Sequence, residues 1–278
     1  MEPRPSSDAP RAIGVAQTVP VRGDVDANVE QHLRLIRIAA EERARILVFP
    51  ELSLTGYELA LAAALAFEQA DARLAPLLDA ASSSSITLIV GAPARLESRL
   101  HIGAFIVYPT GATELYTKHH LGAFGPGARR DGTVPSAEAT VFQPGNRDPL
   151  VRFGEEVGAV AVCADVGPSH SRQAAARGAR TYLASMFVIP SEHERETATL
   201  RAAATEHGMT VAFANYGGPS GGLAAAGGSA IWSGTGALLG RLGPIGAGVA
   251  IATEERGGWS VRTVMLSEGR ASASGRRA

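Results

Sequence analysis

The sequence is very poor in cysteine: Cys163 is the only one among 278 residues. A single cysteine excludes a disulfide within the chain and is typical of reducing compartments, so we expect a cytoplasmic protein. The first residues lack the apolar stretch of a signal peptide. The longest helix-like apolar run, around residues 59–67, is far shorter than the roughly 20 residues that span a bilayer. We therefore expect no membrane association.

The chain also lacks an excess of charge of either sign. It has 26 Lys and Arg residues and 27 Asp and Glu residues, which gives a net charge of −1. Such a balance gives no electrostatic reason to expect a nucleic-acid partner. Hydrophobic residues make up 45%, enough for a large core, and no Pro/Ser-rich linker divides the interior. We predict one domain over residues 11–266, with flexible ends at 1–10 and 267–278.

Short apolar runs alternate with amphipathic stretches along the chain, which indicates a layered α/β domain with mixed strand pairing. The predicted helices are 26–43, 71–80, 169–177 and 192–207. The predicted strands are 12–18, 44–50, 86–92, 101–108, 113–117, 157–163, 181–185, 210–215, 229–233, 248–252 and 259–265, with 101–108 and 113–117 forming a hairpin.

Three of these strands end at residues whose side chains can take part in catalysis. Glu51 follows the strand that Pro50 stops, Lys118 follows another strand, and Cys163 closes a third. Open α/β sheets place their chemistry just beyond the carboxyl edge of the strands. Each residue alone also has a structural interpretation: Glu51 as a helix-capping carboxylate, Lys118 as a solvated ammonium and Cys163 as a small buried thiol.

Together the three residues suit acyl transfer. A free thiol, with a pKa of about 8.5, is mostly protonated at neutral pH and needs a base, which Glu51 can provide. Attack on a carbonyl creates an oxyanion, which Lys118 and the backbone N–H of Ala164 can stabilise. The opposite charges of Glu51 and Lys118 keep each other ionised beside the thiol.

Three ordered segments carry a family resemblance: Phe-Pro-Glu at 49–51, Tyr-Thr-Lys-His-His-Leu at 116–121 and Val-Cys-Ala-Asp at 162–165. They resemble the signature segments of the carbon–nitrogen hydrolase (nitrilase) superfamily. Segments 141–145 and 172–179 match the same pattern, and the likeness runs from about residue 12 to 266.

The resemblance implies a four-layer α-β-β-α sandwich of two mixed sheets in a single domain. It also implies a cofactor-free and metal-free thiol hydrolase of small amides, carbamoyl compounds or nitriles with a Glu51–Lys118–Cys163 triad. Family members commonly have a second glutamate that orients the lysine and the substrate. Glu138 is the only glutamate between Lys118 and the 141–145 segment, so it is the candidate, with a surface carboxylate as the alternative. The resemblance further implies a homodimer or larger homo-oligomer.

The sequence departs from the family pattern at two places. Ser169 follows Pro168 where many relatives have glutamate, a supportive position that leaves the triad intact. Ala164-Asp165 follows the nucleophile where nitrilases usually have Trp-Glu, which favours an amide over a nitrile substrate.

Pocket residues are predicted at the ends of neighbouring strands. Tyr57, Met186 and Phe187 are placed to line the site, with simple core packing as the alternative for each. The glycine-rich loop at 215–222 lacks the Gly-Lys-Ser/Thr of a phosphate-binding loop, and we expect it to form a pocket wall.

Three other functions stay open from the sequence. The chain could be a nitrilase, or a catalytically silent scaffold that binds a metabolite or a partner protein. His119, His120 or His170 could instead form a Cys-His dyad with Cys163, but that would leave Glu51 and Lys118 unexplained. The histidines and the single cysteine show no zinc-ligand spacing.

Overall fold

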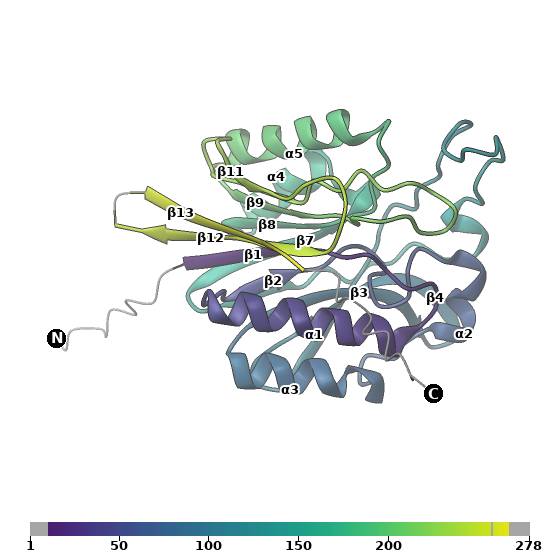
Figure 1. The fold of residues 1–278 in the computed structure, drawn as a ribbon, viewed down its shortest axis with the longest axis horizontal. Helices are drawn as coiled ribbons and strands as arrows, with labels where there is room; N and C mark the ends of the chain where they lie inside the picture. Colours follow the sequence, from purple (N-terminus) through teal and green to yellow (C-terminus); the bar gives the residue numbers. More distant parts are fainter. Residues whose placement is uncertain (1–10, 257, 267–278) are drawn as a thin grey trace, which may run out of the picture.

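Two mixed β-sheets form the centre of the protein, which is described here by a computed structural model covering residues 11–256 and 258–266 (Figure 1). The first sheet has seven strands. In spatial order they are β13 (Gly258–Met265), β12 (Gly248–Glu255), β1 (Arg11–Gln17), β2 (Ile46–Val48), β3 (Thr87–Leu96), β4 (Arg99–Val107) and β5 (Thr113–Thr117). Strand β1 is parallel to β2, and β2 is parallel to β3, whereas the other pairs are antiparallel.

The second sheet has six strands in the order β11 (Leu238–Arg241), β10 (Ala230–Trp232), β9 (Thr210–Ala214), β8 (Thr181–Ser185), β7 (Glu156–Val162) and β6 (Leu150–Phe153). Its three central strands, β7 to β9, are parallel. The α-helices are α1 (Val25–Glu41), α2 (Ala62–Leu65), α3 (Ala75–Ser84), α4 (Pro168–Ala176) and α5 (His193–His207).

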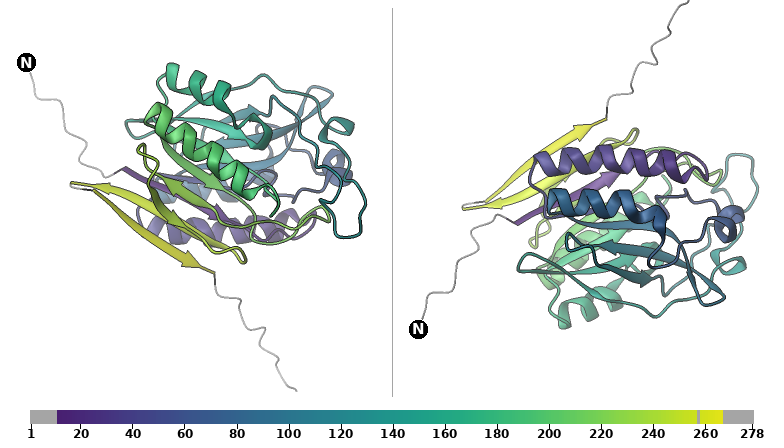
Figure 2. Two further views of the ribbon diagram at one scale, coloured as in Figure 1. Left: turned by 90° about the horizontal axis from the view of Figure 1, so that it is seen from above. Right: turned by 90° about the horizontal axis from the view of Figure 1, so that it is seen from below.

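The helices and sheets stack in four layers, as the resemblance implied. Figure 2 shows α4 and α5 over the outer face of the six-stranded sheet, and α1 and α3 over the outer face of the other sheet. Alternate residues of one strand therefore pack into different cores. Ile13 and Val15 of β1 face the second sheet, whereas Ala12 and Ala16 belong to the cluster that packs against α1 and α3. The predicted fold class is confirmed.

The parallel strands of both sheets point the same way, so their carboxyl ends share one edge of the sandwich. Just beyond β1 and β9, Thr18 and Tyr216 form a parallel bridge between the sheets. The hydroxyl of Ser185, at the end of β8, donates to the carbonyl of Phe49 after β2 at 2.8 Å. Side chains that follow these strands are therefore brought together.

Local deviations from the predicted elements have physical causes. Strand β7 ends at Val162, and Cys163 begins a 3-10 helix instead of closing the strand. Helix α3 begins at Ala75 because Asp71 caps a preceding 3-10 turn through the amide of Arg73. The sequence analysis missed β6 and β11, two four-residue strands at the edges of the second sheet.

Three sequence expectations concern the ends of the chain and the membrane. The predicted flexible ends, 1–10 and 267–278, lie outside the described residues. Within 11–256 and 258–266, no helix has the length and apolar character needed to cross a membrane.

Gly91 is the position at which β3 meets the loop that carries Glu51. A Cβ atom there would lie 2.3 Å from the Leu52 nitrogen and 2.6 Å from the Pro50 oxygen. Both are backbone atoms, so the loop cannot yield without moving Glu51.

We therefore expect Gly91→Ala to lower the free energy of unfolding by about 1–3 kcal/mol, the typical cost of overpacking, and to displace Glu51. Gly243→Ala is the matched control, because its Cβ would meet nothing within 4 Å. Chemical denaturation of both variants measures the difference. Equal stabilities would show that the loop is not held by this close approach.

Candidate active site

Glu51 lies in the turn after β2 and is 1% exposed. The next residue, Leu52, has a φ of 54°, which turns the chain sharply behind the carboxylate. The hydroxyl of Tyr216, just after β9, donates a hydrogen bond to the backbone oxygen of Glu51. The second sheet thus fixes the position of a carboxylate that belongs to the first sheet.

Lys118 follows β5 and is fully buried. The 142–145 segment packs directly against this strand end: the Gly145 amide donates to the Lys118 carbonyl at 2.7 Å, and a Cβ on Gly145 would lie 2.1 Å from Oγ1 of Thr117. The Lys118 ammonium donates to Oε1 of Glu51 at 2.7 Å and to Oε1 of Glu138 at 2.8 Å. One buried cation is therefore shared by two carboxylates.

Glu138 opens a 3-10 helix, Glu138–Thr140, and is 2% exposed. Besides Lys118, it accepts a hydrogen bond on Oε1 from the Tyr57 hydroxyl at 2.9 Å. Its Oε2 accepts from the Gly122 amide at 2.7 Å. These contacts exclude the alternative of a surface carboxylate. They hold Glu138 in a position to pair with the Lys118 ammonium.

Cys163 has an unusual backbone conformation, with a φ of +44°. Non-glycine residues in this region are strained and cluster at functional sites, where the surrounding structure holds them. The Cys163 carbonyl accepts from the Val166 amide at 2.9 Å, which closes the turn after β7. The sulfur lies 3.8 Å from the carbonyl oxygen of Phe187, its hydrogen-bond partner.

Asp165 connects this turn to the chain that carries Lys118. Its carboxylate accepts from the Tyr116 hydroxyl at 2.7 Å, from the His120 amide at 2.7 Å and from Nδ1 of His120 at 2.9 Å. The amide of His119 donates to both carboxylate oxygens at 3.2 Å. The sequence analysis used Asp165 only as a sign of substrate class. Its position directly after the cysteine is the signal that could have indicated this positioning role.

Burial dominates the electrostatics of Glu51. It disfavours the carboxylate and raises the pKa of Glu51 to about 7; the Lys118 charge opposes this shift and the Glu138 charge adds to it. For Lys118, burial disfavours the ammonium, but the neighbouring negative charges, Glu51 first, outweigh it and raise the pKa of Lys118. Lys118 therefore stays protonated, whereas Glu51 can gain and lose a proton near neutral pH.

Burial also raises the pKa of the Cys163 thiol well above its usual value, and the Glu51 charge adds to this effect more than Lys118 offsets it. The sulfur is therefore a thiol at neutral pH and needs a base at the moment of attack. Oε2 of Glu51 is buried and has no hydrogen-bond partner among the described residues. This oxygen is free to receive a proton.

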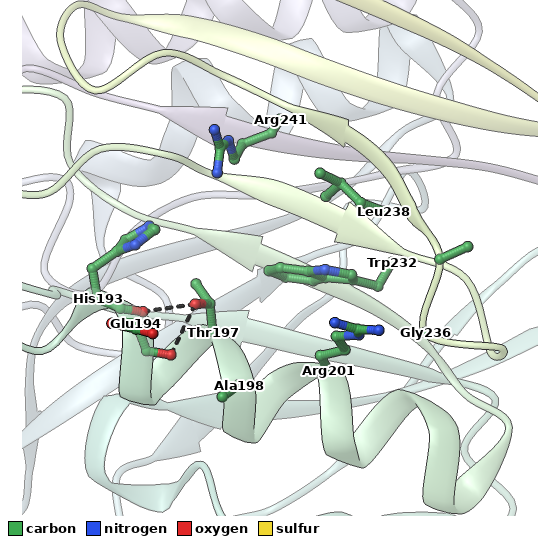
Figure 3. A pocket seen from close by; sticks show the side chains of 10 residues that line it. His193, Glu194, Thr197, Ala198, Arg201, Trp232, Gly236, Leu238 and Arg241 are labelled. Atoms are coloured by element: carbon green, nitrogen blue, oxygen red, sulfur yellow. Dashed lines mark hydrogen bonds between the residues drawn. The ribbon is translucent and has the colours of Figure 1, made fainter.

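A cavity of about 240 Å³ opens onto Cys163. Phe124, Phe187, Val166 and Val188 give it apolar walls, and Glu138 lies in its lining. Its other lining residues are Tyr57, Gly122, Ala123, Ala164, Glu192, Arg195 and Glu196. A separate cavity of about 530 Å³ lies between α5 and the β10–β11 edge, and none of the predicted site residues lines it (Figure 3).

The structure places most of the predicted pocket residues at the first cavity. Tyr57, Ala164 and Phe187 line it. Met186 does not: it is fully buried and packs in the core under α4 and α5. Phe187 belongs to the apolar cluster between the two sheets, whereas Met186 belongs to the cluster on the helix side of the second sheet.

The loop at 215–222 also differs from its expected place. Its glycines line other cavities, and its contribution to the site is the Tyr216 hydroxyl that holds Glu51. The sequence analysis also missed Phe124, Val166 and Val188 in the walls and the three charged residues Glu192, Arg195 and Glu196 at α5.

The histidines near the site have other partners. His120 binds Asp165, and His170 lies 2.9 Å from the Tyr182 hydroxyl. Within the described part of the chain, no hydrogen bond joins a histidine to Cys163, so the Cys-His dyad has no geometric support. Over the same residues, no group of three or more His, Cys, Asp or Glu side chains is arranged to hold a metal ion.

Comparison with known proteins identifies the family of this chain. The family model described as carbon-nitrogen hydrolase matches residues 12–260. The chain belongs to the carbon–nitrogen hydrolase family. The family resemblance found in the sequence is thereby confirmed.

Several similar structures are of one enzyme, the amidase from Nesterenkonia sp. AN1, which is assigned to the nitrilase superfamily. One variant, with the acetamide moiety of fluoroacetamide attached to its active-site cysteine, is 28% identical over 91% of this chain and 93% of that chain, with a TM-score of 0.77. A variant in complex with butyramide is 29% identical over 88% and 90%, with a TM-score of 0.76. A third, in complex with acrylamide, is 28% identical over 92% and 93%, with a TM-score of 0.77.

Four groups donate hydrogen bonds to Asp165, and this generates a prediction. In Asp165→Asn, one carboxylate oxygen becomes an NH2 group, which cannot accept the hydrogen bond that the buried Tyr116 hydroxyl donates to Oδ2, and the remaining hydrogen bonds lose their charged acceptor. We expect the free energy of unfolding to fall by about 1.5–3 kcal/mol, the usual range for hydrogen bonds to a charged group. Thermal or urea unfolding measures the change.

Asp79→Asn in α3 is the matched control, because it makes the same exchange at an exposed position and should change stability by only about 0.5 kcal/mol or less. An Asp165→Asn variant as stable as this control would contradict the role of Asp165 as the link between the two loops.

Proposed function

We propose that the protein hydrolyses the C–N bond of small, non-peptide amides through a thioester on Cys163. The observation that carries this proposal is the Lys118 ammonium held between the buried carboxylates of Glu51 and Glu138 beside a cavity that contains the cysteine. Such a cluster costs free energy to bury, and a purely structural role does not require it. The proposal therefore assigns it to catalysis.

In the proposed acylation step, Sγ of Cys163 attacks the amide carbon while Glu51 takes the thiol proton. Lys118 and the Ala164 N–H stabilise the negative charge on the carbonyl oxygen, which is where preorganised donors lower the barrier most. Glu51 then gives the proton to the leaving nitrogen. The C–N bond breaks, ammonia or an amine departs, and a thioester remains.

In the second step, Glu51 takes a proton from water, and the resulting hydroxide attacks the thioester carbon. The tetrahedral intermediate collapses with cleavage of the C–S bond, and the sulfur regains the proton from Glu51. The products are the acid and the free thiol. Glu138 is a positioning residue in this scheme, because it contacts Lys118 and Tyr57.

The size of the cavity supports a small substrate. Its volume of about 240 Å³ is below the roughly 300–1,000 Å³ that drug-sized ligands occupy. The similar amidase was captured with butyramide and with acrylamide, which are short aliphatic amides. A cytoplasmic location and a homo-oligomeric state stay predictions from the sequence, and size-exclusion chromatography tests the latter.

Ammonia release from short aliphatic amides tests the proposal. The wild-type protein should hydrolyse them, and Cys163→Ala should lower kcat by at least about a thousandfold, as loss of a nucleophile does. The thermal midpoint of this variant should stay near that of the wild type, which separates loss of chemistry from loss of folding. Residual ammonia release by folded Cys163→Ala would overturn the thiol mechanism.

Nitriles of the same carbon chain separate the two hydrolase candidates. Amides should react faster, and hydroxylamine should divert the thioester to a hydroxamate at the expense of free acid. Faster turnover of the nitriles would favour a nitrilase. No turnover of either compound class, together with binding of an amide to the cavity, would favour the silent scaffold.

The raised pKa of Glu51 predicts the pH profile. Glu51 must be ionised to act as the base, and its pKa in the folded protein is about 7. The value of kcat/KM, which reports ionisations of the free enzyme, should therefore rise with pH, level off above about 7, and fall about tenfold per unit below it.

An ordinary glutamate, with a pKa of about 4.3, would leave the profile flat down to pH 5. A requirement for free thiolate would instead place the rise well above pH 8. Either profile would contradict the assignment of Glu51 as the base. The thermal midpoint measured at each pH excludes unfolding as the cause of the fall.

A further inference from the structure

One part of the lining of the active-site cavity, its charged rim, consists of Glu192, Arg195 and Glu196. They come from the residue that precedes α5 and from the first turn of that helix. The two carboxylate side chains are 28% and 19% exposed, whereas the Arg195 side chain is 70% exposed. The carboxylates are therefore the buried part of this rim, and the guanidinium lies over them on the solvent side.

One guanidinium does not balance these two carboxylates. Arg195 contacts only Oε1 of each, at 2.8 Å for Glu196 and 3.6 Å for Glu192. The N-terminus of α5 adds a positive charge of only about 0.5. Consistent with incomplete compensation, burial raises the pKa of Glu192, with Arg195 opposing the shift and the Glu196 charge adding to it.

The rest of the described lining carries no spare positive charge either. It includes no lysine or histidine and no arginine besides Arg195. Lys118, which contacts the lining residue Glu138, is already shared by Glu51 and Glu138. The lining also includes the apolar side chains of Phe124, Val166 and Val188.

We propose that the cavity selects amides that carry a positive charge at the end remote from the amide group. The amide would lie at Cys163, a short apolar chain would contact the apolar walls, and an ammonium would contact Glu192 and Glu196. The same arrangement disfavours amides with a remote carboxylate, because like charges repel at partly buried sites. This inference rests on the proposed amidase function and specifies its substrate class.

Glu194 provides a matched control for the charge of the rim. It belongs to the same turn of α5, but it lines the other cavity, between α5 and the β10–β11 edge (Figure 3). Glu194→Gln therefore removes the same charge from the same helix end without changing the wall of the active-site cavity.

The test compares three amide series of increasing chain length: ω-amino amides such as 4-aminobutyramide, the neutral alkyl amides of matching length, and ω-carboxylate amides such as succinamate. At the preferred length we expect kcat/KM to decrease in the order cationic, neutral, anionic amide. The ratio of kcat/KM for the cationic amide to that for the neutral amide should fall roughly fivefold in Glu192→Gln and in Glu196→Gln, which is the effect of losing one modest ion pair. It should not change in Glu194→Gln, and added salt should lower it in the wild type.

Equal or faster turnover of the neutral amides at every length would overturn this inference and leave the amidase function intact. A fall of equal size in Glu194→Gln would overturn it too, because the effect would then be general to the helix. Absence of ammonia release from all three series would instead overturn the proposed function, and this inference with it.

Discussion

The buried ammonium of Lys118 is the contact on which the arrangement of the site depends. It joins Glu51, at the end of β2, to Glu138, in the loop after β5, with both nitrogen–oxygen distances below 2.9 Å. Loss of one partner from such a buried cluster typically costs about 3–5 kcal/mol, because the remaining charge is buried and unpaired. The loop that carries Glu138, the Glu51 turn and the end of β5 are therefore coupled, and they adopt one conformation together.

This coupling also explains the ionisation states that the chemistry needs. Two carboxylates keep Lys118 protonated, while burial raises the pKa of Glu51 to about 7. In the proposed mechanism, the thiol stays neutral until Glu51 accepts its proton. Cys163 is held at a strained φ of +44° by the turn after β7, and Asp165 ties that turn to the chain next to Lys118. The strain and the buried charges thus belong to one assembly at the shared edge of the two sheets.

Much of this site could be predicted from the sequence because the decisive signals were local. A buried strand followed by proline and a carboxylate locates Glu51. The ends of two other predicted strands locate Lys118 and Cys163 in the same way. Glu138 followed from the resemblance and from being the only glutamate in its interval. The alternation of strands and helices indicated a layered α/β domain, and the family resemblance implied the four layers.

Contacts between distant segments could not be predicted in this way. Tyr216 supports Glu51 across 165 positions of the chain, and only the packing of one sheet on the other brings them together. The error at Met186 has a related cause: the sequence located the end of the strand but not which of two neighbouring side chains faces the cavity. The charged rim was missed because Glu192, Arg195 and Glu196 lie in the predicted helix 192–207, and the local sequence does not show which of its side chains line the cavity.

Mass spectrometry of the acid-quenched reaction tests the central claim most directly. The protein is mixed with a short aliphatic amide, quenched within the first turnovers and digested. The account predicts an acyl group on the peptide that contains Cys163, with the mass of the substrate acid minus water, and its loss after treatment with hydroxylamine. Turnover of the amide without any acyl group on that peptide, or with an acyl group on another residue, would contradict it.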